Sequence, residues 1–340
     1  MLNPDRSVNS DRSNIENRLH IEYLLDTKAA AENEAQDVIL GLKRSPKTIP
    51  PRYFYDSKGS ELFEQICQLP EYYPTRTEAY ILEQYAADIA RKTLALELVE
   101  LGSGSSTKTR LLLDAYQSLN SPLYYLPIDV SSSILKDSAY NLLADYPNLK
   151  IQGTVATYTQ ALQQLQDSAF GKRTIIFLGS SIGNLNPIEC DRFIDEITLA
   201  LNPGDYLLLG IDLQKSPKIL EAAYNDSQEV TAEFNLNMLQ HLNWRFDANF
   251  DLDLFTHQAI YNRVENQIEM YLISSQAHIV RLKNLDLIVN FAEGETILTE
   301  ISRKFDIEEM SKYLETKGLQ LIKKYTDYKQ WFGLLLCQKQ

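Results

Sequence analysis

A glycine-containing loop at residues 100–110 has the residue types and spacing of a ligand-binding loop. It reads ELGSGSSTKTR, with Gly102 and Gly104 two positions apart. A short apolar run before it predicts a buried strand, and helical spacing follows it. A strand, a glycine loop and a helix in this order bring backbone N–H groups close to a ligand. A tight strand-to-helix turn without a ligand is the alternative interpretation.

The spacing within the loop distinguishes between ligand classes. A dinucleotide site requires glycine or alanine at position 107, where this chain has Thr107. The Gly-Lys-Ser/Thr sequence of a phosphate-binding P-loop is also missing. A methyl-donor site needs glycines that admit the donor and an acidic residue at the end of the second strand, which Asp129 supplies. Asp129 could instead cap the helix that begins at Ser131 to Ser133.

Methyl transfer suits a site of this kind. Transfer from a sulfonium is an in-line displacement, so alignment of acceptor, methyl carbon and leaving sulfur can supply most of the acceleration. An amine acceptor must first lose its proton, and the pocket should therefore favour the neutral amine. Aromatic side chains can lie beside a cationic donor, and the chain has 20 tyrosines.

The composition indicates a globular protein with a small-molecule partner. The chain has 340 residues, is 44% hydrophobic and has a formal net charge of −13, so we expect neither nucleic acid nor an anionic membrane as partner. The cysteines, Cys67, Cys190 and Cys337, are far apart, and the histidines show no ligand spacing. We therefore expect no disulfide framework and no metal. No apolar run is long enough for a membrane span, and we expect a soluble, cytoplasmic protein.

Strands and helices alternate after residue 92, and this alternation must position the loop. Candidate strands, rich in Leu, Ile, Val or Tyr, are 94–101, 123–129, 149–156, 174–180 and 206–212. Candidate helices between them are 107–118, 132–145, 158–166 and 187–201. The pattern predicts an α/β fold with a parallel, doubly wound sheet, since near-continuous apolar strands are buried on both faces.

The flanking segments have a different pattern. Residues 1–17 are polar and predict a disordered tail without a signal peptide. We expect helices at 21–42 and 60–69, and Thr75 with Glu78 has the spacing of a capping box that opens another helix. Beyond residue 213 we expect a helical stretch at 215–240, antiparallel strands at 258–264 and 267–280, a helix at 302–317 and closing strands at 319–325 and 331–337.

Several blocks of sequence accompany the glycine loop in a fixed order. They are RYFYD at 52–56, LPEYYPTR at 69–76, FLGSSIGNL at 177–185, TAEFN at 231–235 and TEISRKF at 299–305. This set resembles the L-histidine Nα-methyltransferase family of ergothioneine biosynthesis, whose members trimethylate free histidine to hercynine with S-adenosylmethionine as the methyl donor. The resemblance runs from about residue 20 to the C-terminus. It implies a Rossmann-like class I S-adenosylmethionine-dependent methyltransferase fold with a C-terminal antiparallel hairpin, plus a second, α+β domain that binds substrate.

The resemblance also implies which residues bind the donor. Gly102 and Lys108 would contact its methionine end, with Gly104 in the same loop, and Asp129 would contact its ribose. The family usually has an acidic residue followed by an aromatic one where the adenine amino group is bound. This chain has Thr157 and Tyr158 there. Because threonine accepts a hydrogen bond but carries no charge, we expect a modest difference in donor affinity.

The residues implied for histidine come from segments that are far apart in the sequence. Tyr55 would orient the acceptor amine, directly or through water. The α-carboxylate and amino end would be held near Gly179 by three side chains, Tyr72, Asn184 and Tyr224. The imidazole would bind Glu300 and Ser302, with Met270 packed against the ring. A carboxylate opposite a ring N–H would reject amino acids that lack this donor.

Each of these residues also has an ordinary structural interpretation. The tyrosines could be core residues with paired hydroxyls, and Asn184 could be a turn residue. Glu300 and Lys304 could form an exposed i,i+4 pair on a helix. Lys108 could be solvated at the start of its helix, and Met270 could be a core residue.

The resemblance finally implies a chain of two lobes. The methyltransferase domain would comprise 77–213 and 303–340, and the histidine-binding domain 18–76 and 214–302. The active site would lie between them, at the carboxyl ends of the parallel strands. We expect a monomeric enzyme whose partner is L-histidine. The same fold acting on another small amino acid or amine, and a non-catalytic protein that keeps the donor fold, are the alternatives.

Overall fold

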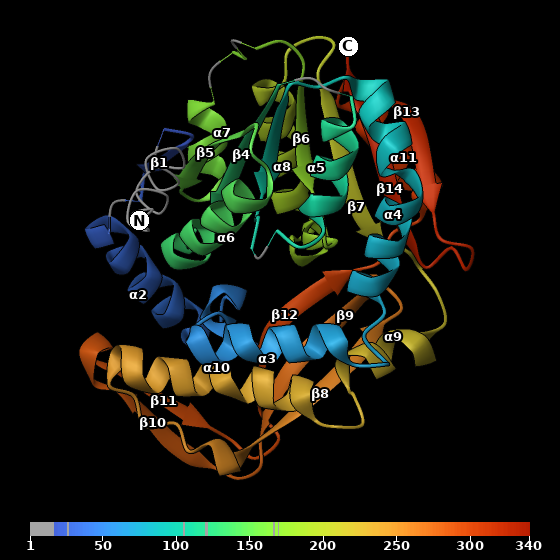
Figure 1. The fold of residues 1–340 in the computed structure, drawn as a ribbon. Coiled ribbons are helices and arrows are strands. Elements are labelled where there is room, and N and C mark those ends of the chain that lie inside the picture. Colours follow the sequence, from blue (N-terminus) through green and yellow to red (C-terminus); the bar gives the residue numbers. More distant parts are fainter. Residues whose placement is uncertain (1–16, 26, 105, 120–121, 166, 169) are drawn as a thin grey trace, which may run out of the picture.

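The computed structural model describes residues 17–340 except 26, 105, 120–121, 166 and 169 (Figure 1). The tail predicted for residues 1–17 lies outside the described residues apart from Asn17. Within the described part, no helix combines the length and the apolar character that crossing a membrane requires.

A large sheet of eight strands forms the upper part of Figure 1. Its order is β1 (Leu19–Tyr23), β5 (Leu149–Val155), β4 (Leu123–Asp129), β3 (Glu97–Leu101), β6 (Arg173–Phe177), β7 (Tyr206–Asp212), β14 (Phe332–Lys339) and β13 (Leu319–Thr326). The first six strands in this order, β1, β5, β4, β3, β6 and β7, pair in parallel. Strand β14 is antiparallel to both β7 and β13. This arrangement confirms the predicted class I fold with its C-terminal antiparallel hairpin.

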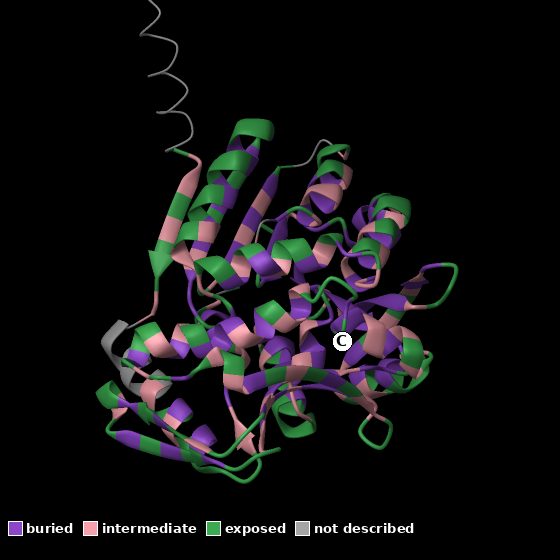
Figure 2. Ribbon diagram, turned by 90° about the horizontal axis from the view of Figure 1, so that it is seen from below, coloured by how far each residue is buried: buried purple, intermediate pink, exposed green. Residues whose placement is uncertain are grey.

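Helices cover both faces of this sheet and bury its strands (Figures 1 and 2). Neighbouring residues of one strand point to opposite faces, so Leu98 packs in one core and Val99 in another. The first core contains α4 (Pro74–Thr93), α5 (Thr109–Gln117) and α6 (Ser132–Asp145). The second contains α7 (Tyr158–Gln164), α8 (Pro187–Ala200) and α11 (Ile307–Thr316).

A smaller part with a third core lies below the large sheet in Figure 1. Its four-stranded sheet has the order β2 (Lys47–Thr48), β12 (Thr296–Arg303), β9 (Gln267–Ser274) and β8 (Phe255–Asn262). A separate hairpin joins β10 (His278–Leu282) and β11 (Leu287–Phe291). The helices of this part are α2 (Thr27–Lys43), α3 (Ser57–Gln68), α9 (Pro217–Tyr224) and α10 (Val230–Phe246), with short 3-10 turns at η1 (Pro51–Phe54), η3 (Leu252–Leu254) and η4 (Lys283–Leu285).

Four predicted elements differ from the structure. The helical stretch predicted over 215–240 is divided between α9 and α10. The helix predicted over 21–42 begins only at Thr27, because Leu19–Tyr23 pairs with β5 as the edge strand of the large sheet. The helix predicted from residue 302 begins at Ile307, where Asp306 accepts hydrogen bonds from two backbone N–H groups of the first turn. The strand predicted over 267–280 is divided between β9 and β10. The division of the chain into two domains stays a prediction.

A buried ion pair inside the large sheet allows a test of the fold. Glu97 of β3 pairs with Arg173 of β6, and the two side chains are only 4% and 3% exposed. Removing the carboxylate breaks the buried ion pair of the Arg173 guanidinium, which costs about 3 kcal/mol or more. We therefore expect Glu97→Ala to lower the free energy of unfolding by about this amount in urea denaturation.

Asp145→Ala is the matched control, because Asp145 and its partner Arg110 are 58% and 33% exposed. An exposed pair of this kind contributes roughly 1 kcal/mol or less. Equal losses of stability in the two variants would contradict the structural importance of the Glu97 pair.

Candidate functional site

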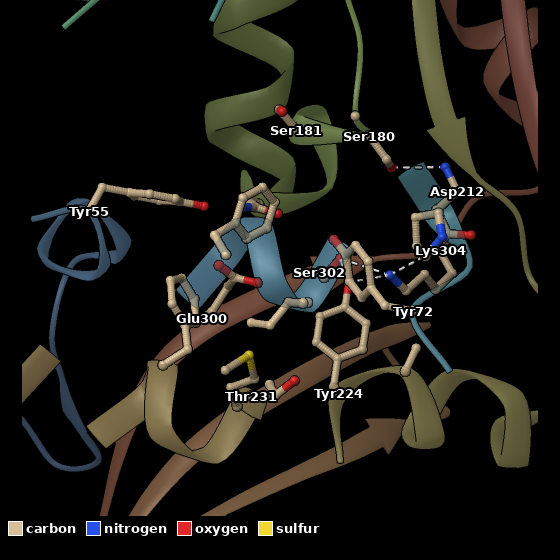
Figure 3. A pocket seen from close by; sticks show the side chains of 18 residues that line it. Tyr55, Tyr72, Ser180, Ser181, Asp212, Tyr224, Thr231, Glu300, Ser302 and Lys304 are labelled. Atoms are coloured by element: carbon tan, nitrogen blue, oxygen red, sulfur yellow. Dashed lines mark hydrogen bonds and ion pairs between the residues drawn. The ribbon is translucent and has the colours of Figure 1, made fainter. Parts of the chain in front are cut away.

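A pocket lies where the carboxyl ends of β6 and β7 meet the smaller sheet (Figure 3). Tyr55 and all seven residues expected around histidine line it, namely Tyr72, Gly179, Asn184, Tyr224, Met270, Glu300 and Ser302. The large sheet contributes the turn η2 (Ser181–Asn184) after β6 and Asp212 at the end of β7. The structure therefore brings together residues from segments that are far apart in the sequence.

Aromatic rings form one wall of the pocket. Tyr55 follows η1, and its ring makes edge contacts with Phe63 and Phe234 at centroid distances of 5.9 and 5.8 Å. Tyr72 makes similar contacts with Phe63 and Tyr224 at 6.3 and 6.1 Å. Figure 3 shows the hydroxyl of Tyr55 pointing into the pocket.

The pocket keeps its phenols protonated. Desolvation in the pocket raises the pKa values of Tyr72 and Tyr224, and also that of Tyr55, although the Tyr55 residue as a whole is 49% exposed; the carboxyl of Glu300 adds to the effect at all three. A protonated phenol can accept and donate hydrogen bonds but is a weak base. These side chains are therefore suited to orienting a ligand.

Glu300 and Ser302 reach the pocket from strand β12. The two residues are two positions apart, so they point to the same face of the strand. An irregularity in the pairing with β9 lies between Leu298 and Glu300, after which Glu300 is opposite Met270. Burial raises the pKa of the Glu300 carboxyl to about 7, although the charge of Lys304 opposes the shift. A ligand N–H beside this carboxyl would favour its ionised form.

A buried ionic network lies next to these residues and was not predicted. Asp212, which is 1% exposed, accepts hydrogen bonds from the Tyr73 hydroxyl and is ion-paired with Lys304 at 2.9 Å and Lys215 at 2.5 Å. Burial alone would raise the pKa of Asp212, but the two lysines outweigh it and lower the pKa. The predicted alternative of an exposed Glu300–Lys304 helix pair is wrong, since Glu300 is on a strand and Lys304 is 3% exposed.

The glycine loop lies at the carboxyl ends of β3 and β4. Gly102 has a φ of +76°, and a Cβ there would lie 2.5 Å from the hydroxyl of Tyr158, so glycine is required. The backbone N–H of Gly104 donates to the Asp129 carboxylate at 3.0 Å. Asp129 also accepts from the backbone of Ser131 at 2.9 Å, while Ser131 itself occupies the N-cap of α6. The loop, Asp129 and Tyr158 therefore lie together, as a donor site would need.

Glu78 connects this loop with the pocket. Its fully buried carboxylate is ion-paired with Lys108 and accepts hydrogen bonds from the backbone of Gly179 at 2.9 and 3.0 Å. The predicted capping box of Thr75 and Glu78 is wrong, because α4 begins at Pro74 and Glu78 points inward. Gly210 of β7 makes room, since a Cβ there would overlap with the carboxylate. In the sequence, the inward position of Glu78 is indicated by its spacing of three and four residues from Ile81 and Leu82, which places all three on one face of the helix.

The two residues expected near the adenine, Thr157 and Tyr158, lie at the start of α7. Thr157 is exposed and caps α7, accepting from the backbone of Gln160 at 3.3 Å, while Tyr158 packs against Phe177 and Phe193. Several lining residues were not predicted, namely Phe63, Ile66, Pro74, Ser180, Ser181, Asp212, Ala223, Thr231, Phe234 and Lys304. In the part of the chain that the structure describes, no cluster of three or more His, Cys, Asp or Glu could hold a metal ion.

Comparison with known proteins gives the relatives of this chain. This chain is 43% identical to the histidine N-alpha-methyltransferase of Mycolicibacterium smegmatis, in an alignment that covers 94% of this chain and 99% of that enzyme. The enzyme of the same name from Mycobacterium tuberculosis is also 43% identical, over 89% and 94% of the two chains. Among solved structures, an S-adenosylmethionine-dependent methyltransferase from Clostridium acetobutylicum aligns with a TM-score of 0.42 and 13% identity, over 76% of this chain and 91% of that one.

A family model described as "Histidine-specific methyltransferase, SAM-dependent" matches residues 34–339. This match covers nearly the whole chain, including the glycine loop and every residue that lines the pocket. The chain therefore belongs to the family of histidine-specific, S-adenosylmethionine-dependent methyltransferases.

Proposed function

We propose that this enzyme transfers three methyl groups from S-adenosylmethionine to the α-amino group of free L-histidine, giving hercynine for ergothioneine biosynthesis. The observation that carries the proposal is the single pocket that contains Tyr55 and all seven residues expected around histidine. The two relatives of 43% identity, both named histidine N-alpha-methyltransferase, support the substrate. A relative in Neurospora crassa named ergothioneine biosynthesis protein 1, 29% identical over 87% of this chain, supports the pathway.

The residues around the glycine loop suit the methyl donor. S-adenosylmethionine supplies an activated methyl group on a sulfonium. Gly102 leaves space where a Cβ would be obstructed. The Asp129 carboxylate at the end of β4 would accept from the ribose hydroxyls. Lys108, which is ion-paired with Glu78, would also pair with the donor's carboxylate. Tyr158 and the exposed Thr157 would lie near the adenine.

The pocket suits the two ends of a free amino acid. Tyr72, Asn184 and Tyr224 would hold the carboxylate and amino end, and in the first two transfers the Tyr55 phenol would accept a hydrogen bond from an N–H of the neutral amine. The neutral dimethylated amine of the third transfer has no N–H, so its position would depend on the contacts of the carboxylate and the imidazole. Such a bond would direct the nitrogen lone pair toward the donor, which is the alignment that in-line transfer requires.

The imidazole would bind at β12. Glu300 would accept the ring N–H and Ser302 would donate to the other ring nitrogen, with Met270, which is 2% exposed, packed against the ring. An amino acid without a ring N–H would leave the Glu300 carboxylate unpaired, which explains selectivity for histidine.

We also propose that the domains divide these tasks. Residues 77–213 and 303–340 would hold the donor, and residues 18–76 and 214–302 would hold histidine. The enzyme would act as a monomer in the cytoplasm, without nucleic acid or membrane as a partner. The net charge of −13 supports the absence of a polyanionic partner. The three free cysteines support a reducing compartment.

Mass spectrometry tests the reaction. Incubation with S-adenosylmethionine and L-histidine should give histidine with one, two and finally three added methyl groups on the α-nitrogen. Other free amino acids serve as competing substrates in parallel reactions. Accumulation of a dimethyl product would contradict trimethylation, and no product at all would contradict the proposed function.

Glu300→Ala tests the imidazole contact. The lost acceptor should weaken histidine binding roughly tenfold or more, corresponding to one charged hydrogen bond, in calorimetry with the protein saturated with S-adenosylhomocysteine. The affinity for S-adenosylhomocysteine should not change. Glu293→Ala is the control, because Glu293 is exposed. Unchanged histidine affinity in Glu300→Ala would contradict the assignment.

The raised pKa of Glu300 predicts a pH dependence of stability. The pKa is about 7 in the folded protein and about 4.3 in an unfolded chain. Between these values the unfolded chain releases a proton that the folded protein retains, so stability falls as the pH rises toward 7. Glu300→Gln removes this contribution. We expect the variant to gain stability relative to the wild type from about pH 4.5 to 7, measured by urea denaturation, whereas Glu293→Gln should follow the wild type. A constant difference between Glu300→Gln and the wild type would contradict this prediction.

A further inference from the structure

We propose that Lys304 is a positioning residue of the histidine site, which makes the hydroxyls of Tyr224 and Ser302 hydrogen-bond donors toward the ligand. The inference rests on the proposed function, since the ligand is histidine. Lys304 lines the pocket just after β12, and its side chain has no solvent exposure. It does not need to touch the reacting atoms to act in this way.

The ammonium of Lys304 has three partners for its three hydrogens. The Nζ–Oδ2 distance to Asp212 is 2.9 Å, the distance to Ser302 Oγ is 2.8 Å and the distance to the Tyr224 hydroxyl oxygen is 3.1 Å. An ammonium has three donors and no acceptor. Its donors are therefore matched by one carboxylate and two hydroxyls.

This geometry limits where the two hydroxyl hydrogens can point. Both oxygens already receive an N–H from Lys304, so each hydroxyl must use its own hydrogen on another acceptor. The Tyr224 hydroxyl donates to Ser302 Oγ at 2.9 Å. Ser302 Oγ thus accepts two hydrogen bonds, and its own hydrogen is left to point into the pocket.

The resulting pattern matches a neutral imidazole. Ser302 offers a donor and Glu300, two residues earlier on the same face of β12, offers an acceptor. A neutral imidazole has one N–H donor and one nitrogen acceptor. When histidine binds, Tyr224 can redirect its hydrogen to the ligand carboxylate, because Lys304 still donates to Ser302.

Asp212 holds Lys304 in its charged form. Burial opposes the charge, but Asp212 and Tyr224 outweigh this effect and raise the pKa of Lys304. Asp212 has a second lysine, Lys215, which contacts the Tyr73 hydroxyl at 2.8 Å but neither Tyr224 nor Ser302 in any described hydrogen bond. The two lysines therefore share a carboxylate and differ in their contact with the pocket hydroxyls.

Lys304→Met and the matched control Lys215→Met test the inference. Both variants remove one cation from Asp212, but only the first removes the donors to the hydroxyls. In calorimetry of the full chain saturated with S-adenosylhomocysteine, we expect Lys304→Met to weaken L-histidine binding roughly tenfold or more. We expect Lys215→Met to weaken it by less than about threefold, and both to bind S-adenosylhomocysteine normally. Equal losses of histidine affinity in the two variants would overturn the inference.

A double-mutant cycle separates positioning from a general structural role. If Lys304 acts through Ser302, then Ser302→Ala and Lys304→Met remove the same interaction, and their effects on histidine affinity should be far from additive. Additive effects would overturn the inference. Lys304→Gln, which lacks the charge, provides a second variant if Lys304→Met does not fold, and wild-type affinity in it would also overturn the inference. Failure of the wild type to bind histidine would instead refute the proposed function together with the inference.

Discussion

The carboxylate of Asp212 connects the large sheet with the segment that follows strand β12 of the smaller sheet. It lies at the end of β7, pairs with Lys304 just after β12 and accepts from Tyr73 before α4. Its backbone N–H donates to Ser180 Oγ at 2.8 Å, which holds Ser180 at a φ of +56°. Because a non-glycine residue at positive φ is unfavourable, such a contact is needed to retain it. Asp212 thus contacts both sides of the pocket, with its carboxylate on the side of Lys304 and with its backbone on the side of Ser180.

Glu78 connects the glycine loop with the pocket, as Asp212 connects the large sheet with the segment after β12. It binds Lys108 on the donor side and the backbone of Gly179 on the pocket side. A shift of either partner would leave a buried carboxylate poorly compensated, which is costly. The relative position of the glycine loop and the pocket therefore depends on the contacts of Glu78 in α4 as well as on the strands. Gly210 is part of the same arrangement, since a side chain there would displace Glu78.

The sequence predicted features that depend on local patterns. The parallel strands and the glycine loop are signalled by apolar runs and turn residues. The lining residues that were predicted come from the resemblance to a family. The assignment of 302 onward to a helix failed because the irregularity after Leu298 breaks the alternation of β12. The contacts of Lys304 with Asp212 and of Glu78 with Lys108 join residues far apart in the chain. No spacing rule within one element could reveal them.

The pocket contains two carboxyl groups in opposite environments. Asp212 has two lysines, which lower its pKa below the usual value despite burial. Glu300 has its pKa raised to about 7, since Lys304 only partly offsets its burial. A group of the first kind is already paired and serves to hold structure, whereas a group of the second kind gains most from a ligand that brings a hydrogen-bond donor. The two environments therefore indicate different roles: Asp212 is suited to maintain the structure of the site, and Glu300 is suited to recognise a ligand.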